Sequence, residues 1–180
     1  MTFSLLSVAF TVAPRLPLGL VMRAAHVGAG IAARRGGASI ARLRANMARL
    51  TGSEPTEELV VAAVRSHIRN YAEELMLGSR RGAPLAEGIT FEGFGELVAA
   101  SVDGPVVLAL GHSVSWDRAG AWVCANGRTI VTVAEKGEPR SLFQRFVALR
   151  EGLGMEVIGV GKGDSVFATL VERVRGRSVI

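Results

Sequence analysis

Residues 105–117 read PVVLALGHSVSWD, an apolar run that passes directly into a glycine and a group of polar side chains. The run at 105–110 is continuous rather than alternating, which is typical of a parallel strand buried on both faces. Residues 116–126 then have helical periodicity and end at Gly127. The stretch therefore predicts a strand, a turn and a helix. Its polar side chains follow the carboxyl end of the strand, the edge where open α/β sheets bind ligands.

The same alternation continues toward the end of the chain. We predict strands at 129–134 and 155–160, helices at 141–153 and 165–174, and the start of a further strand at 178–180. Strands that alternate with helices through short loops build a mainly parallel sheet. We therefore expect an α/β fold with a mainly parallel central sheet flanked by helices. Because the sequence stops inside the last predicted strand, we also expect it to be the front part of a longer protein.

The segment before this domain is strongly basic. Residues 1–53 hold seven arginines and no acidic residue, whereas the remaining 127 residues hold 14 basic and 16 acidic side chains. The arginines are Arg15, Arg23, Arg34, Arg35, Arg42, Arg44 and Arg49. Within 38–50, apolar residues recur at helical spacing and leave the arginines outside the stripe. Apolar helix faces bordered by arginine suit the boundary of an anionic bilayer.

The basic segment has other interpretations. No uninterrupted apolar stretch reaches the about 20 residues of a spanning helix, and no positive charge precedes the first apolar residues as in a secretory signal. The helices could simply pack on the main domain with their arginines in solvent. Nucleic-acid binding is disfavoured, because aromatic residues make up only 6% of the chain and none alternate with the arginines. We divide the chain into membrane-associating helices at 1–53, packed on the core, and an α/β domain at 54–180 that opens with a helix at 56–77.

Composition argues against several kinds of site. With a single cysteine, Cys124, the chain can form neither an internal disulfide nor a cysteine-based zinc cluster. Its three histidines, His26, His67 and His112, are scattered along the sequence, which disfavours a histidine-rich metal site. We therefore expect no metal.

Two motifs compete for the polar residues after the first predicted strand. Ser113 could be the nucleophile of a G-x-S-x-G elbow, although Ser115 replaces the last glycine and no histidine follows in this sequence. Alternatively, His112 and Asp117 form an H-x4-D pair. A carboxylate that orients the imidazole would let His112 take a proton from a hydroxyl as it attacks a thioester. A purely structural helix cap remains an alternative for the pair.

The stretch 105–122, PVVLALGHSVSWDRAGAW, resembles the bacterial lipid A biosynthesis acyltransferase family, and in particular its actinobacterial phosphatidylinositol mannoside branch. Further similarity lies at 34–37, 44–50, 66–75, 133–135 and 142–157. The resemblance implies a glycerolipid-acyltransferase-like α/β fold. It also implies transfer of a fatty acyl chain, such as palmitoyl, from acyl-CoA to a sugar hydroxyl of a glycolipid. The reaction would take place on the cytoplasmic face of the inner membrane, with acyl-CoA as co-substrate and no metal or redox cofactor.

The resemblance also implies roles for individual residues. His112 would be the general base and Asp117 its orienting partner. Arg150 would lie near the CoA phosphates, Glu135 near the glycolipid acceptor, and Trp116 among the substrate-binding residues. Two alternatives to this enzyme stay open, namely a serine hydrolase that uses Ser113 and a truncated, non-catalytic fragment that only binds the anionic membrane surface.

Overall fold

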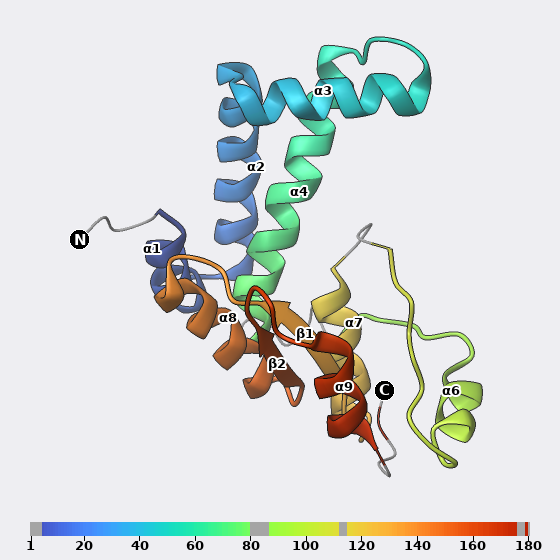
Figure 1. Ribbon diagram of the computed structural model, residues 1–180. Helices are drawn as coiled ribbons and strands as arrows, with labels where there is room; N and C mark the ends of the chain where they lie inside the picture. Colours follow the sequence, from blue (N-terminus) through green and yellow to red (C-terminus); the bar gives the residue numbers. More distant parts are fainter. Residues whose placement is uncertain (1–4, 80–86, 112–114, 176–178, 180) are drawn as a thin grey trace.

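The computed structural model describes residues 5–79, 87–111, 115–175 and 179. This part of the chain is mostly helical and contains a small sheet of two parallel strands (Figure 1). It is therefore a mixed α/β fold, as the sequence predicts, but with much more helix than sheet.

The basic segment forms consecutive helices. They are α1 (Leu5–Val12), the 3-10 turn η1 (Ala13–Arg15), α2 (Leu18–Arg35) and α3 (Ala38–Thr51). Gly36 and Gly37 separate α2 from α3 with φ angles of 70° and 105°, which side chains other than glycine rarely adopt. None of the helices in the described ranges combines the length and apolar character needed to cross a bilayer.

The long helix α4 (Glu57–Leu77) connects this segment to the rest of the fold. Its N-cap is Thr56, whose hydroxyl oxygen accepts a hydrogen bond from the Leu59 amide at 3.3 Å. Figure 1 shows α2 running alongside α4, and the two helices pack through Ala29, Ala33 and Val64. The small alanines let the helix backbones approach closely.

The second half of the chain contains α6 (Phe94–Ala100), α7 (Trp116–Ala125), β1 (Val131–Glu135), α8 (Arg140–Gly152), β2 (Glu156–Val160) and α9 (Val166–Val174). Helix α8 is the crossover between β1 and β2, which pair in parallel from Val131 opposite Glu156 to Glu135 opposite Val160. The predicted helices and these two strands are confirmed, with boundaries that differ by one or two residues.

The prediction of a strand at 105–110 is wrong. These residues have no regular secondary structure, and Val107 and Leu110 are 88% and 60% exposed. Within the described residues, the one hydrogen bond that the backbone of this run makes to a distant segment joins the Val106 amide to the Val179 carbonyl, at 3.0 Å. An apolar run becomes a strand only where neighbouring backbones pair with it along its length. The strand start predicted at 178–180 lies outside the described residues except for Val179.

Candidate functional site

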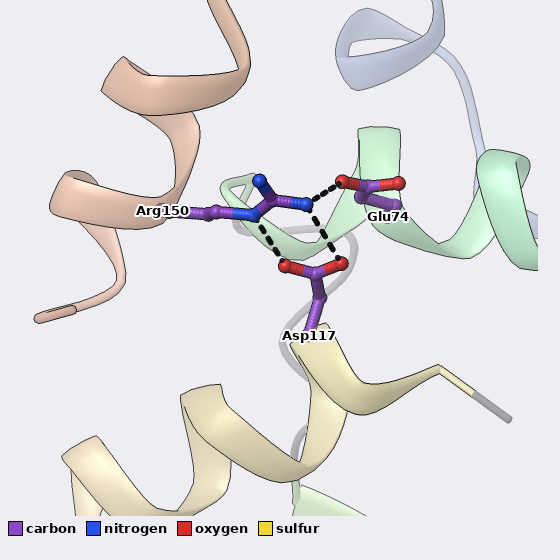
Figure 2. A network of polar contacts seen from close by, with 3 residues as sticks. All are labelled: Glu74, Asp117 and Arg150. Carbon is purple, nitrogen blue, oxygen red and sulfur yellow. Dashed lines mark hydrogen bonds and ion pairs between the residues drawn. The ribbon is translucent and has the colours of Figure 1, made fainter. Parts of the chain in front are cut away.

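Three helix ends bring three charged side chains together (Figure 2). Glu74 comes from the last turn of α4, Asp117 from the first turn of α7 and Arg150 from the last turn of α8. The Arg150 guanidinium donates from Nε to Asp117 Oδ1 at 2.8 Å and from Nη2 to Asp117 Oδ2 at 3.4 Å. Nη2 also donates to Glu74 Oε1 at 3.2 Å. We call these three residues the Glu74–Asp117–Arg150 cluster.

Local structure and ring stacking fix the orientation of Arg150. Its guanidinium carbon lies 4.5 Å from the ring centre of Trp116 and 5.9 Å from that of Phe146. Trp116 is the first residue of α7, so the helix that carries Asp117 also supplies the ring on which Arg150 stacks. A planar guanidinium can stack its face on a ring while its edge donates two hydrogen bonds to one carboxylate, a geometry that the compact ammonium group of lysine does not offer.

Burial gives the cluster unusual electrostatics. The side chains of Arg150, Glu74 and Asp117 are only 15%, 5% and 4% exposed. The pKa of Glu74 is raised to about 8. The largest cause is burial, and the negative charge of Asp117 is the second, while the positive charge of Arg150 lowers the pKa. A carboxyl group with such a pKa is mostly protonated at neutral pH.

The cluster lines a cavity of about 680 Å³ whose walls are partly polar and partly apolar, and which we call the polar cavity because the charged cluster lies on it. Glu135, at the carboxyl end of β1, lies on the same cavity, as do several aromatic side chains. The aromatic residues are His67, Tyr71, Trp116, Phe143 and Phe146. The cavity therefore combines buried charge with flat apolar surfaces, a common composition for binding sites of small molecules.

A second cavity, of about 390 Å³, has almost entirely apolar walls. Its lining includes Leu108, Leu110, Val123, Ile130, Leu170 and Val179. Trp116 and Val133 belong to the walls of both cavities. The polar cavity and the apolar cavity are thus neighbours, divided by one aromatic and one aliphatic side chain.

The structure brings together most of the residues that the sequence singled out. Asp117, Trp116, Glu135 and Arg150 all line the polar cavity, although they are up to 34 positions apart in the chain. Arg150 contacts Asp117 directly, an interaction that the sequence analysis did not foresee. His112 and the alternative nucleophile Ser113 lie outside the described residues.

Sequence reasoning missed Glu74. A signal existed, because Glu74 follows Tyr71 by three positions and precedes Leu75, both of which belong to the apolar stripe of the helix. A carboxylate on that face must be buried, and it therefore needs a partner. The neighbouring Glu73 obscures the signal, since a pair of glutamates usually indicates a solvated helix surface.

The described ranges contain no group of three or more His, Cys, Asp or Glu side chains that could hold a metal ion.

Comparison with known proteins points to one family. The family model of the bacterial lipid A biosynthesis acyltransferases matches residues 1–180. A phosphatidylinositol mannoside acyltransferase of Mycobacterium tuberculosis is 38% identical over 172 residues, which cover 92% of this chain and 54% of the relative. Its counterpart in Mycolicibacterium smegmatis is 36% identical over 164 residues, 88% of this chain and 53% of the relative.

The chain spans about half the length of these curated relatives. The family model matches the chain from its first to its last residue, and these relatives cover about nine tenths of it. The chain belongs to the bacterial lipid A biosynthesis acyltransferase family.

Proposed function

We propose that the protein transfers a fatty acyl chain from acyl-CoA to a sugar hydroxyl of a phosphatidylinositol mannoside or a related glycolipid. The observation that carries this proposal is the pair of neighbouring cavities, because the reaction needs a polar site for chemistry beside an apolar site for the acyl chain. The relatives named above are phosphatidylinositol mannoside acyltransferases by name, which supports the proposed acceptor.

In the proposed reaction, His112 is the general base and Asp117 orients it. His112 takes the proton of the acceptor hydroxyl while the oxygen attacks the thioester carbonyl. A C–O ester bond forms, the C–S bond breaks, and the proton passes to the departing thiolate to give free CoA. The Asp117 carboxylate is held by two hydrogen bonds from Arg150, which supports a role as a rigid positioning group.

The cavities suggest where the substrates lie. We place the acyl chain in the apolar cavity and the thioester beside Trp116, which separates the two spaces. Glu135 is exposed on the polar cavity and is suited to accept hydrogen bonds from sugar hydroxyls. For Arg150, orientation of Asp117 is the role that the contacts support, and the CoA phosphates are a further expected contact.

The basic helices support attachment to a membrane surface. Six of the seven arginines, all except Arg44, are exposed. Large apolar side chains on the same helices are exposed as well: Val8, Val12, Leu20, Val27 and Ile31. We propose that this surface binds peripherally to anionic lipid on the cytoplasmic face of the inner membrane, where both amphiphilic substrates are found.

Release of free CoA from palmitoyl-CoA, with and without a mannosylated phosphatidylinositol acceptor, tests the proposal. Acceptor-stimulated release is expected from the wild-type chain, and His112→Ala should reduce it by roughly 100-fold or more. Ser113→Ala is the matched control and should retain activity. Loss of activity in Ser113→Ala together with covalent labelling by a fluorophosphonate would instead support the serine hydrolase and contradict the proposed chemistry.

A further inference from the structure

The Glu74–Asp117–Arg150 cluster contains two carboxyl groups and one guanidinium. If both carboxyl groups were ionised, the cluster would hold an uncompensated negative charge at a site where the carboxyl side chains are at most 5% exposed. An unpaired buried charge is so costly that a carboxyl group in this position normally takes up a proton. One of the two carboxyl groups must therefore be the neutral one.

The hydrogen bonds indicate which group keeps the charge. Asp117 accepts two hydrogen bonds from Arg150, one to each oxygen, whereas Glu74 accepts one. Charge-assisted bidentate pairs are among the strongest polar contacts in proteins. The negative charge is therefore best stabilised on Asp117.

The two helix ends favour the same assignment. Asp117 lies in the first turn of α7, where the helix dipole stabilises negative charge. Glu74 lies in the last turn of α4, where the same dipole disfavours a carboxylate. Two independent features, hydrogen bonding and helix position, thus assign the proton to Glu74.

We propose that Glu74 acts as a neutral carboxylic acid that accepts a hydrogen bond from Arg150 and donates its own proton to Asp117, and so positions the ionised Asp117 carboxylate. Arg150 Nη2 donates both to Glu74 Oε1, at 3.2 Å, and to Asp117 Oδ2, at 3.4 Å, so the two carboxyl groups lie side by side. A hydrogen bond between them is one of the causes that raise the pKa of Glu74. The inference rests on the proposed function only where activity is measured. Protonation of Glu74 can be tested without any substrate.

The surroundings of Glu74 offer no competing partner among the described residues. Helix α7 contributes Asp117 and α8 contributes Arg150, while Arg118 of α7 pairs with Glu73 at 3.3 Å. The neighbouring side chains Leu75 and Met76 pack with Ala13 of η1 and with apolar residues of α1 and α2. Titratable groups elsewhere on the polar cavity are His67 and Tyr71 of α4, Glu135 of β1, and Glu138.

The cluster should consequently change with pH. Ionisation of Glu74 removes its donor hydrogen and places a second negative charge beside Asp117. Arg150 must then be shared between two carboxylates, which weakens its hold on Asp117. Glu74 is thus a positioning residue whose effect on the reaction is exerted through Asp117 and is lost at alkaline pH.

Infrared difference spectroscopy between the wild-type chain and Glu74→Gln tests the protonation. The wild type should show the carbonyl stretching band of a protonated carboxylic acid at neutral pH, and this band should disappear with a midpoint of about pH 8. Glu73→Gln is the matched control, since Glu73 is paired with Arg69 and Arg118 and its replacement should remove no such band. Absence of the band at neutral pH in the wild type would overturn the inference.

The pH profile of CoA release tests the positioning role. Wild-type activity should fall as the pH rises through about 8, the fall should be absent in Glu74→Gln, and Glu73→Gln should keep the wild-type profile. If the wild type and Glu74→Gln share the same alkaline fall, the positioning role is wrong. If the wild type releases no CoA at all, the proposed function fails while the infrared result still decides whether Glu74 holds a proton.

Discussion

Along α4, the middle of the helix packs against α2 through alanine and valine side chains, whereas the last turn packs against α7 and α8 through a buried glutamate. The first contact is apolar and is formed by small side chains, and Figure 1 shows the two helices side by side there. The second contact depends on the balance of charge among Glu74, Asp117 and Arg150. One helix therefore connects a proposed membrane-binding region with a candidate active site through two different kinds of interaction.

The two contacts should respond differently to mutation. An apolar contact loses stability in proportion to lost or strained packing and is nearly indifferent to pH. A buried charge cluster is stable only while each charge has a partner. Loss of one member leaves another charge buried and unpaired, and its desolvation cost is then no longer compensated. The largest effects of mutation are therefore expected in the charge cluster.

Removal of the single cation should have the largest effect. Arg150→Met keeps most of the side-chain volume but leaves Asp117 as a buried carboxylate without its ion pair, which should cost about 3–5 kcal/mol of unfolding free energy. Arg145→Met on the same helix is the control, because Arg145 is exposed and should cost less than about 1 kcal/mol. Urea denaturation measures both, and equal losses in the two variants would contradict a special role for Arg150.

The stability of the wild type should depend on pH through Glu74. Its folded-state pKa of about 8 lies above the usual value of 4.5, so the folded chain keeps a proton that the unfolded chain releases. The Glu74 contribution is therefore fully present below the unfolded pKa and is lost as the pH rises toward 8, at about 1.4 kcal/mol per unit of pKa difference. Glu74→Gln should lack this fall. Parallel stability curves for wild type and Glu74→Gln across this range would contradict the raised pKa.

Overpacking of the apolar contact should have an intermediate effect. Ala29 is fully buried between α2 and α4, so Ala29→Leu should cost about 1–3 kcal/mol without altering the pH dependence of stability. Ala24→Leu, at an exposed position of the same helix, should stay within about 0.5 kcal/mol of the wild type. Thermal unfolding at two pH values distinguishes these results from a change in the charge cluster.

Neutralisation of exposed arginines should have the smallest effect per residue. Arg34 and Arg35 end α2 and are exposed, and each replacement by alanine should weaken binding to anionic vesicles by about 1 kcal/mol, or roughly fivefold. Arg175→Ala, outside the basic segment, is the control. Co-sedimentation with phosphatidylserine-containing vesicles measures the loss. Unchanged binding of the Arg34→Ala, Arg35→Ala double variant would refute the proposed membrane surface.

Much of the architecture could be predicted from local sequence. The helix predicted at 56–77, with Thr56 in the preferred residue class for an N-cap, is α4, and the alternation after residue 127 predicted β1, α8, β2 and α9. The cap and the periodicities are short-range signals, because a helix or strand reveals its buried face over a few neighbouring residues. The prediction of a strand at 105–110 was wrong because a strand also needs a long-range partner. Its pairing depends on a distant backbone that the run itself does not specify.

The sequence by itself determined the family and the basic character of the first 53 residues. It also singled out the candidate site residues His112, Asp117, Trp116, Glu135 and Arg150. Only the tertiary structure decided that Arg150 holds Asp117, 33 positions away, and Glu74, 76 positions away. Contacts at such separations leave no periodic trace in the chain. Whether a carboxyl group keeps its proton depends on burial and on the charges that the fold places around it, and these exist only after the helices have packed.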